Sequence, residues 1–223
     1  MSETERIKKN YEDYKSNPIV AKNATFTEYI NQVTKEREKL YKNIILSNFR
    51  KPNELELLEV GAGAGANLSF FKNLGIIDEN IYANELLEDR VIELKNNFPT
   101  IHTLPGDALQ LKFENKFDIV FQSTVFTSIL DADLKKQFAD KLWKMTKPNG
   151  IILWYDFMYD NPKNKSVKGI NKSEIKLLFN DSKNIEFFKV TLAPPIGRKF
   201  QNMYSFLNSF SFLRTHVIAV IHK

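Results

Sequence analysis

The sequence predicts a three-layer α/β protein with a mostly parallel sheet, and three observations lead to this prediction. Short apolar runs alternate with amphipathic stretches from residue 55 to residue 192, which is typical of parallel strands with helices on both faces. A glycine-rich turn follows the first apolar run. A last apolar run at 215–222 comes after a link that needs no helix of ordinary length, so this strand can return antiparallel.

The predicted elements follow the chain in order. Residues 1–23 are polar and contain Pro18, and we expect a short helix or a cap there. Residues 25–49 carry apolar side chains at helical spacing and predict one long amphipathic helix. Beyond it, strands are expected at 55–60, 80–84, 100–104, 117–122, 150–157, 184–192 and 215–222, and helices at 65–74, 86–97, 131–147 and 171–179.

Composition narrows the class of function. The chain has 223 residues, 43% of them hydrophobic, and a net charge of +5, which predicts a globular domain. Without cysteine there is no disulfide, zinc–thiolate site or cysteine nucleophile. The lysines are spread along the chain, which favours a solvated surface over nucleic-acid binding, although an acidic or phosphorylated acceptor is compatible. The charged N-terminus is no signal peptide and no apolar run approaches a membrane span, so we expect a cytoplasmic protein.

The turn after the first strand has the composition of a nucleotide site. Residues 55–67 read LELLEVGAGAGAN, an apolar run followed by alternating glycines. Gly61, Gly63 and Gly65 allow a tight turn and a close approach of a ligand to the backbone. The helix that follows presents free N–H groups at its start. A purely structural turn is the alternative, because many strand–helix turns carry glycine.

Acidic residues follow the next two strands, at the sheet edge where ligands of such folds bind. Glu85 follows the second strand, and its carboxylate can accept two hydrogen bonds from a ribose diol. Asp107 follows the third strand and can accept from an adenine amino group, while the Ala108 N–H donates to the ring. Each acid has an alternative role at a helix start, Glu85 with the macrodipole and Asp107 as a cap.

With these pieces in order, the chain resembles the class I S-adenosylmethionine-dependent methyltransferases over residues 55–157. The matching pieces are EVGAGAGAN, IYANE, GDA, FDIVFQS and LWKMTKPNGIILWYDF. The resemblance implies S-adenosylmethionine as cofactor and a Rossmann-like sheet of seven strands in the order 3-2-1-4-5-7-6, with strand 7 antiparallel. It places the methionine part at the glycines with its ammonium end toward Glu59, and the ribose at Glu85. The implied cofactor-binding residues are Glu59, Gly61, Ala62, Gly63, Gly65, Asn67, Glu85, Leu86, Asp107, Ala108, Gln122 and Ser123.

Two positions depart from the family's usual pattern. Glutamate replaces the commoner aspartate at Glu59 and at Glu85. The carboxylate chemistry is the same, but each side chain reaches one methylene further.

The C-terminal half has a narrower resemblance. NPKNKSV, TLAPPIGRKF and SFLRTH are similar to bacterial methyltransferases linked to cell-surface saccharides and glycolipids. This implies a small-molecule acceptor, a hydroxyl of a saccharide or glycolipid precursor, and Arg198 and Tyr155 are expected to bind it. We read 1–223 as one domain, with a helical lid at 1–50, a catalytic core at 51–223 and an acceptor-side loop at 193–214. The aromatic side chains of that loop suit an acceptor pocket, a sealed sheet edge or a dimer contact equally, so the chain is expected to be a monomer or a homodimer.

A base would help a hydroxyl acceptor to react. His216 opens the last strand and Asp156 closes the fifth, and these strands are neighbours in the implied order. We therefore predict that His216 and Asp156 form a catalytic pair. A histidine held by structural hydrogen bonds is the alternative. No metal site is expected.

Other functions are compatible with parts of this pattern. An NAD-binding oxidoreductase would fit Gly61-x-Gly63-x-x-Ala66, but the leading helix, the GDA element and the antiparallel end argue against it. An RNA or DNA methyltransferase acting on base amines usually carries Pro-Pro-aromatic after the fourth strand, where this chain has FQSTVF. Pyrimidine carbon-5 enzymes need a cysteine. A protein methyltransferase and a non-enzymatic cofactor-binding scaffold stay open.

Overall fold

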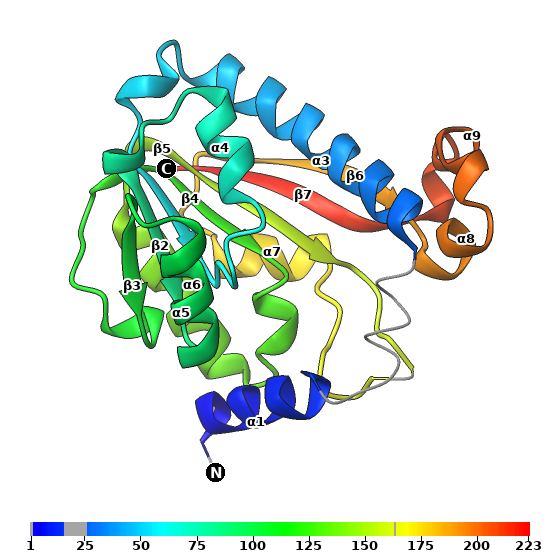
Figure 1. Cartoon of the computed structure of the whole chain (residues 1–223), viewed down its shortest axis with the longest axis horizontal. Coiled ribbons are helices and arrows are strands. Elements are labelled where there is room, and N and C mark those ends of the chain that lie inside the picture. The colour runs from blue at the N-terminus through cyan, green and yellow to red at the C-terminus, as the bar shows by residue number, and fades with distance from the viewer. Residues whose placement is uncertain (1, 16–25, 163) are drawn as a thin grey trace.

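The computed structural model describes residues 2–15, 26–162 and 164–223, and it has the predicted layered architecture (Figure 1). The strands of this part form one seven-stranded sheet in the order β3-β2-β1-β4-β5-β7-β6. β7 runs antiparallel to both of its neighbours, and the other strand pairs are parallel. The expected Rossmann-like order with an antiparallel seventh strand is therefore confirmed.

The strands and helices lie within a few residues of their predicted positions. The strands are β1 (Leu57–Val60), β2 (Ile81–Glu85), β3 (His102–Pro105), β4 (Phe117–Ser123), β5 (Thr146–Phe157), β6 (Asn184–Leu192) and β7 (Arg214–His222). The helices are α1 (Glu3–Lys15), α3 (Thr27–Asn48), α4 (Leu68–Leu74), α5 (Glu88–Asn97), α6 (Ala132–Met145), α7 (Lys172–Leu178), α8 (Pro194–Lys199) and α9 (Tyr204–Asn208).

Two boundaries differ from the prediction for local reasons. The glycine turn uses the residues up to Asn67, so α4 begins at Leu68 rather than at 65. β5 begins at Thr146, inside the expected helix, because Thr146 already pairs with Phe117 before the register shifts at the turn around Asn149. Pro18 and the start of the long predicted helix lie outside the described residues.

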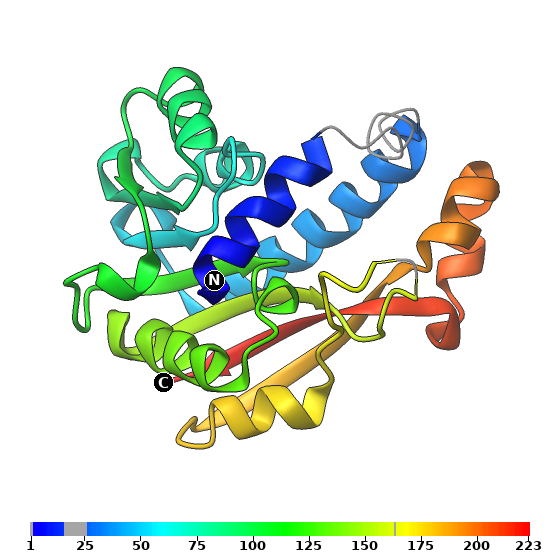
Figure 2. The same ribbon diagram turned by 90° about the horizontal axis from the view of Figure 1, so that it is seen from below.

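Two apolar layers enclose the sheet. One face packs against α3, α4 and α5 in a cluster that includes the fully buried Ile45, Phe71 and Leu94. The opposite face packs against α6 and α7. The long helix α3 is therefore part of one core layer. α1 lies beside the loop after β4, where its Ile7 packs against the second cluster (Figures 1 and 2). No helix within the described residues is both long and apolar enough to cross a bilayer.

Candidate active site

The glycine turn after β1 is shaped by left-handed backbone angles. Gly61 has φ +70° and Gly65 has φ +89°, values that side-chain-bearing residues adopt at a cost. A Cβ on Gly61 would lie 2.5 Å from Val125 Cγ2, and one on Gly65 would lie 2.5 Å from the ring of Phe98. These two glycines are required by the packing of the turn itself.

Gly63 differs from its neighbours because it faces open space. Its φ is +58°, and the nearest atom to a Cβ built there is Arg90 Nη1, at 3.8 Å. Arg90 belongs to the wall of a cavity of about 160 Å³ at the carboxyl ends of the strands. Gly63 is thus the glycine of the turn with an open side-chain position, next to the cavity wall although it does not itself line the cavity.

The cavity joins residues that are far apart in the sequence. α1 closes its outer side with Thr4, Ile7 and Tyr11, and the Tyr11 ring lies under the guanidinium of Arg90, 4.7 Å away. Of the predicted cofactor-binding residues, the cavity wall contains Gly61, Glu85, Leu86, Asp107, Ala108 and Ser123.

Glu85 organises the turn as well as lining the cavity. Its Oε2 accepts a hydrogen bond from the Gly63 N–H at 2.7 Å, and its Oε1 accepts one from the Leu87 N–H at 2.8 Å. A carboxylate oxygen has two acceptor positions, so each oxygen keeps one for a further donor. The buried Glu85 can therefore hold the glycine turn and accept from a diol at once.

Asp107 makes the capping contact that was the alternative to ligand binding. Its Oδ1 accepts from the Leu109 N–H at 2.9 Å and caps the short 3₁₀ turn η3 (Ala108–Gln110). Asp107 and Ala108 also line the cavity. The cap fixes the carboxylate at the cavity wall, so the two roles are compatible.

Gln122 lies behind the cavity wall, where it supports the loop after β4. Its Oε1 accepts from the Val125 N–H at 3.0 Å, and its Nε2 donates to Asp156 Oδ2 at 3.3 Å. The side chain has no exposed surface. Both polar atoms of the side chain are thus used inside the protein, and a contact of Gln122 with the cofactor stays a prediction.

His216 and Asp156 do not pair in the structure, contrary to the prediction. β5 and β7 are neighbours, but in their register His216 lies opposite Phe157, and Asp156 lies opposite Val217. Residues directly opposite each other share a face, and successive residues alternate, so His216 and Asp156 point to opposite faces. The prediction used only the order of the strands, which makes β5 and β7 neighbours. The register of these two strands places the two side chains on opposite faces of the sheet.

Each member of that pair has its own surroundings. Asp156 is buried, accepts from Thr127 Oγ1 at 2.6 Å, and has its pKa raised to about 7 by burial. His216 stacks on Tyr155, with ring centroids 5.2 Å apart, and burial lowers its pKa to about 4. At neutral pH His216 is therefore neutral and only a weak base.

The predicted acceptor residues are also separated. Tyr155 is buried and its hydroxyl lies 3.0 Å from Thr191 Oγ1. Arg198 lies on α8, with its guanidinium 5.7 Å from the Phe26 ring, and does not line the cavity. A group of three His, Asp or Glu side chains that could hold a metal does not occur among the residues described.

A cluster of buried polar atoms lies on the other side of β1, under α3. Glu59 Oε1 accepts from Asn67 Nδ2 at 2.7 Å. Within the described residues, Glu59 Oε2, Arg37 Nε and Tyr41 Oη are buried and lack a hydrogen-bond partner. The Arg37 guanidinium lies over the ring of Tyr155, 4.6 Å from its centroid. A hydrogen-bond acceptor and two donor groups that are buried together without partners are unusual in a folded protein.

This cluster would suit a ligand that carries both an ammonium and a carboxylate. Buried polar atoms without partners are costly, and a zwitterion would satisfy the acid, the guanidinium and the phenol together. The sequence prediction included Glu59 but missed Arg37 and Tyr41. The signal was available, since Arg37 falls four residues after Val33 and four before Tyr41, which places a charge on the apolar stripe of the helix.

Glu59 should make the stability of the ligand-free protein depend on pH. Burial raises its pKa from the ordinary 4.5 to about 8, although Asn67 and Arg37 oppose this rise. Between these two values the unfolded carboxyl is ionised while the folded one keeps its proton, so unfolding releases a proton. The free energy of unfolding should therefore fall as the pH rises from 4.5 to 8.

Thermal melts of the wild type and of Glu59→Gln at pH 5 and pH 8 would measure this effect. The melting temperature of the variant, relative to that of the wild type, should be higher at pH 8 than at pH 5. Equal differences at both pH values would contradict the raised pKa of Glu59.

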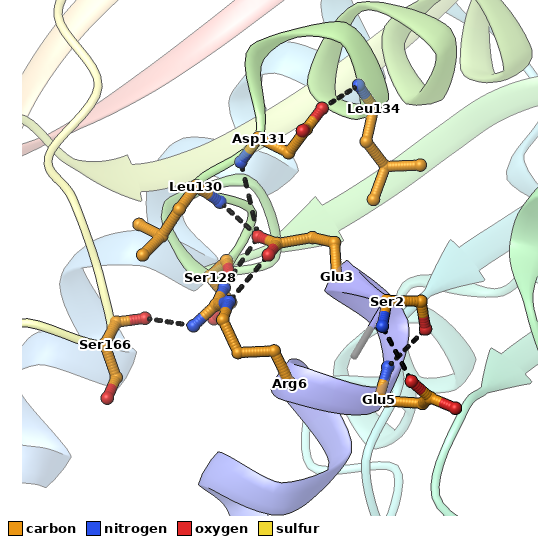
Figure 3. Close-up of polar contacts among 9 residues, drawn as sticks. All are labelled: Ser2, Glu3, Glu5, Arg6, Ser128, Leu130, Asp131, Leu134 and Ser166. Atoms are coloured by element: carbon orange, nitrogen blue, oxygen red, sulfur yellow. Dashed lines mark hydrogen bonds and ion pairs between the residues drawn. The ribbon is translucent and has the colours of Figure 1, made fainter.

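Two side chains of α1 fasten this helix to the loop after β4 (Figure 3). Glu3 Oε1 accepts from the Leu130 N–H at 2.6 Å, and Arg6 donates to the Ser128 carbonyl at 2.6 Å and to the Ser166 carbonyl at 3.3 Å. Glu3 and Arg6 also pair with each other at 2.7 Å, and this hydrogen-bonded pair lowers the pKa of Glu3 to about 2. α1 is thus held in place over the cavity.

Comparison with known proteins agrees with this geometry. Residues 58–154 match a protein family described as "Methyltransferase domain". A protein of Haemophilus influenzae described only as uncharacterized is 27% identical over 177 residues, which are 69% of each chain.

Solved structures share the fold. An S-adenosylmethionine-dependent methyltransferase from Mesorhizobium loti superposes with a TM-score of 0.61 at 10% identity, covering 81% of this chain and 96% of that one. The N-methyltransferase NodS from Bradyrhizobium japonicum, solved with S-adenosyl-L-homocysteine, gives 0.63 at 15% identity, covering 85% and 86%. The family match lies over the central strands and helices, and the solved structures share the seven-stranded fold of this chain.

Proposed function

We propose that this protein transfers a methyl group from S-adenosylmethionine to a hydroxyl of a small-molecule acceptor, a saccharide or glycolipid precursor. One observation carries the cofactor side of the proposal. The cavity beside the glycine turn has a buried carboxylate for a diol, and the cluster under α3 has unsatisfied atoms for a zwitterion. The acceptor class rests on the resemblance of the C-terminal half.

The residues present fit the cofactor at both of its ends. Glu85 would bind the ribose diol, and Asp107 with Ala108 would face the adenine. Glu59 would bind the ammonium, and Arg37 with Tyr41 would bind the carboxylate, which gives each unpaired buried atom a partner. Bound there, S-adenosylmethionine supplies a methyl group that is already activated by its sulfonium.

The chain's own contribution is mainly positioning and exclusion of water. The buried Glu85 is fixed by two backbone N–H groups, so its geometry is set before a ligand binds. α1 covers the cavity, and we propose that it acts as the lid expected for residues 1–50. Because the pKa of His216 is near 4, this histidine is a weak base, and the hydroxyl proton of the acceptor would pass to solvent water as the methyl group leaves the sulfonium, which becomes a neutral thioether.

Calorimetry with two ligands tests the cofactor assignment. S-adenosylhomocysteine should bind with a dissociation constant in the micromolar range, and NAD should not bind, because NAD has no amino-acid zwitterion for the cluster under α3. Binding of NAD without S-adenosylhomocysteine would favour an oxidoreductase and overturn the proposal.

Turnover with a labelled methyl donor tests the acceptor. The label should enter the saccharide and glycolipid fractions of a bacterial extract rather than its RNA or protein. If the label entered RNA or protein, the cofactor assignment would stand, but the acceptor would be RNA or protein rather than a saccharide or glycolipid.

A further inference from the structure

The link between β6 and β7 presents a continuous apolar surface to solvent. The link folds into α8, the 3₁₀ turn η5 (Gln201–Met203), α9 and the 3₁₀ turn η6 (Ser211–Leu213). The exposed fraction reaches 61% for Phe206 and 74% for Phe212. We call the following exposed side chains the apolar face: Phe200, Met203, Phe206, Phe210 and Phe212.

Three rings of the apolar face touch one another. The centroids of Phe206 and Phe210 are 5.5 Å apart, and those of Phe210 and Phe212 are 5.8 Å apart. Other large exposed apolar residues are scattered over separate elements, such as Ile92 on α5 and Leu177 on α7. Grouped exposed apolar side chains mark an interaction site, whereas single ones need no explanation.

The outward direction of these rings is fixed from behind. Tyr204 is buried against Tyr29, with ring centroids 5.9 Å apart, and its hydroxyl donates to Glu36 at 2.6 Å. Asn208 donates to the other oxygen of Glu36 at 2.7 Å. α9 is therefore anchored to α3 through its inner side, so the phenyl rings on its outer side cannot simply turn into the core.

The charge carried by the link and its two flanking strand ends has one sign, although the exposed Glu28 of α3 lies nearby. The sequence from residue 187 to residue 223 contains five lysines and arginines and no aspartate or glutamate. Arg198 and Lys199 lie at the end of α8, and Lys199 Nζ is 5.4 Å from the ring centroid of Phe200. Glu36, which contacts this link, uses its oxygens on the inner side.

We propose that the apolar face docks this protein peripherally on an anionic membrane surface. Phenyl rings that enter the headgroup region, with basic side chains beside them, match the chemistry of such a surface. The link, which is basic and contains no acidic residue, fits anionic lipid, whereas two copies meeting through the same link would place like charges together.

The position of the face has a consequence for the active site. The link leaves β6 at the end of the sheet where β5 also ends, and Figure 1 shows α8 and α9 at the far end of β6 and β7. Docking would therefore turn that edge toward the lipid. The inference stands apart from methyl transfer, since membrane docking needs no turnover.

Flotation with vesicles tests this inference on the full chain. Wild-type protein should float with vesicles of equal parts phosphatidylglycerol and phosphatidylcholine, and not with phosphatidylcholine alone. Phe206→Ser/Phe212→Ser should weaken flotation by about tenfold or more, since two buried rings are lost. Arg198→Gln/Lys199→Gln should also weaken it, and added salt should weaken the wild type.

Two control variants remove an apolar side chain and basic charges at positions outside the apolar face. Leu177→Ser removes an apolar side chain that is 75% exposed on α7, and Lys95→Gln/Lys112→Gln removes two exposed charges near the other end of the sheet. Both should float like the wild type. The Lys95→Gln/Lys112→Gln variant could instead lose as much flotation as the Arg198→Gln/Lys199→Gln variant. That result would show a general effect of charge and would overturn the assignment. A second result would also overturn it. In that result the wild type sediments as a dimer, the Phe206→Ser/Phe212→Ser variant sediments as a monomer, and neither protein binds vesicles.

Discussion

Replacing Gly63 by leucine should abolish cofactor binding and leave the domain folded. The Gly63 side-chain position is open, with only Arg90 Nη1 near a built Cβ, so a leucine fits the fold but enters the ligand's space. Affinity for S-adenosylhomocysteine should fall at least about 100-fold. The left-handed angle at Gly63 should cost about 1–2 kcal/mol of stability. Titration calorimetry and thermal melting of the same preparation would measure both effects.

Gly75→Leu is the matched control for backbone strain. Gly75 has φ +108° at the end of α4, and the nearest atom to a Cβ there is Pro52 Cβ at 3.7 Å. This variant should lose stability at least as much as Gly63→Leu and bind normally. If Gly63→Leu also bound normally, Gly63 would be needed only for the turn.

Arg37→Met should weaken S-adenosylhomocysteine binding by about 10- to 100-fold, the effect of losing a hydrogen bond to a charged group. The ligand-free protein should lose little stability, because Arg37 Nε has no partner to lose and methionine keeps most of the apolar contact with Tyr155. Affinity from calorimetry and stability from melting would separate the two effects.

The control for Arg37→Met lies on the same helix. Lys39→Met removes a positive charge from an exposed position of α3, two residues further along. It should leave the affinity unchanged. An Arg37→Met protein with normal affinity and lower stability would mean that Arg37 holds α3 in place and does not bind the cofactor.

The order and direction of the strands could be predicted because they depend on features that sequence carries locally. Alternating periods mark strands and helices, and the motifs around Gly61 and Glu85 carry the resemblance that supplied the strand order. The face of the sheet to which each side chain of β5 and β7 points could not be predicted from the sequence. A shift of one residue in register moves His216 from one face to the other, and no turn joins these two strands to set their register.

The cofactor side of the candidate site was predicted better than the acceptor side for a similar reason. Glu85 and Asp107 lie next to strand ends, so the fold fixes their position. Gln122 is also at a strand end, but its amide is used by Val125 and Asp156, a choice that only packing reveals. Arg37 comes from a helix far from the motif, and its orientation depends on how α3 crosses the sheet.

The fastening of α1 has a kinetic consequence. The helix forms the outer wall of the cavity, and its first turn is held by the bonds of Glu3 and Arg6 to residues 128–130 and 166. A ligand leaving on that side must wait until these bonds break together. If the spent cofactor leaves on that side, its release requires α1 to open first, and the rate of this opening would then limit turnover in place of methyl transfer.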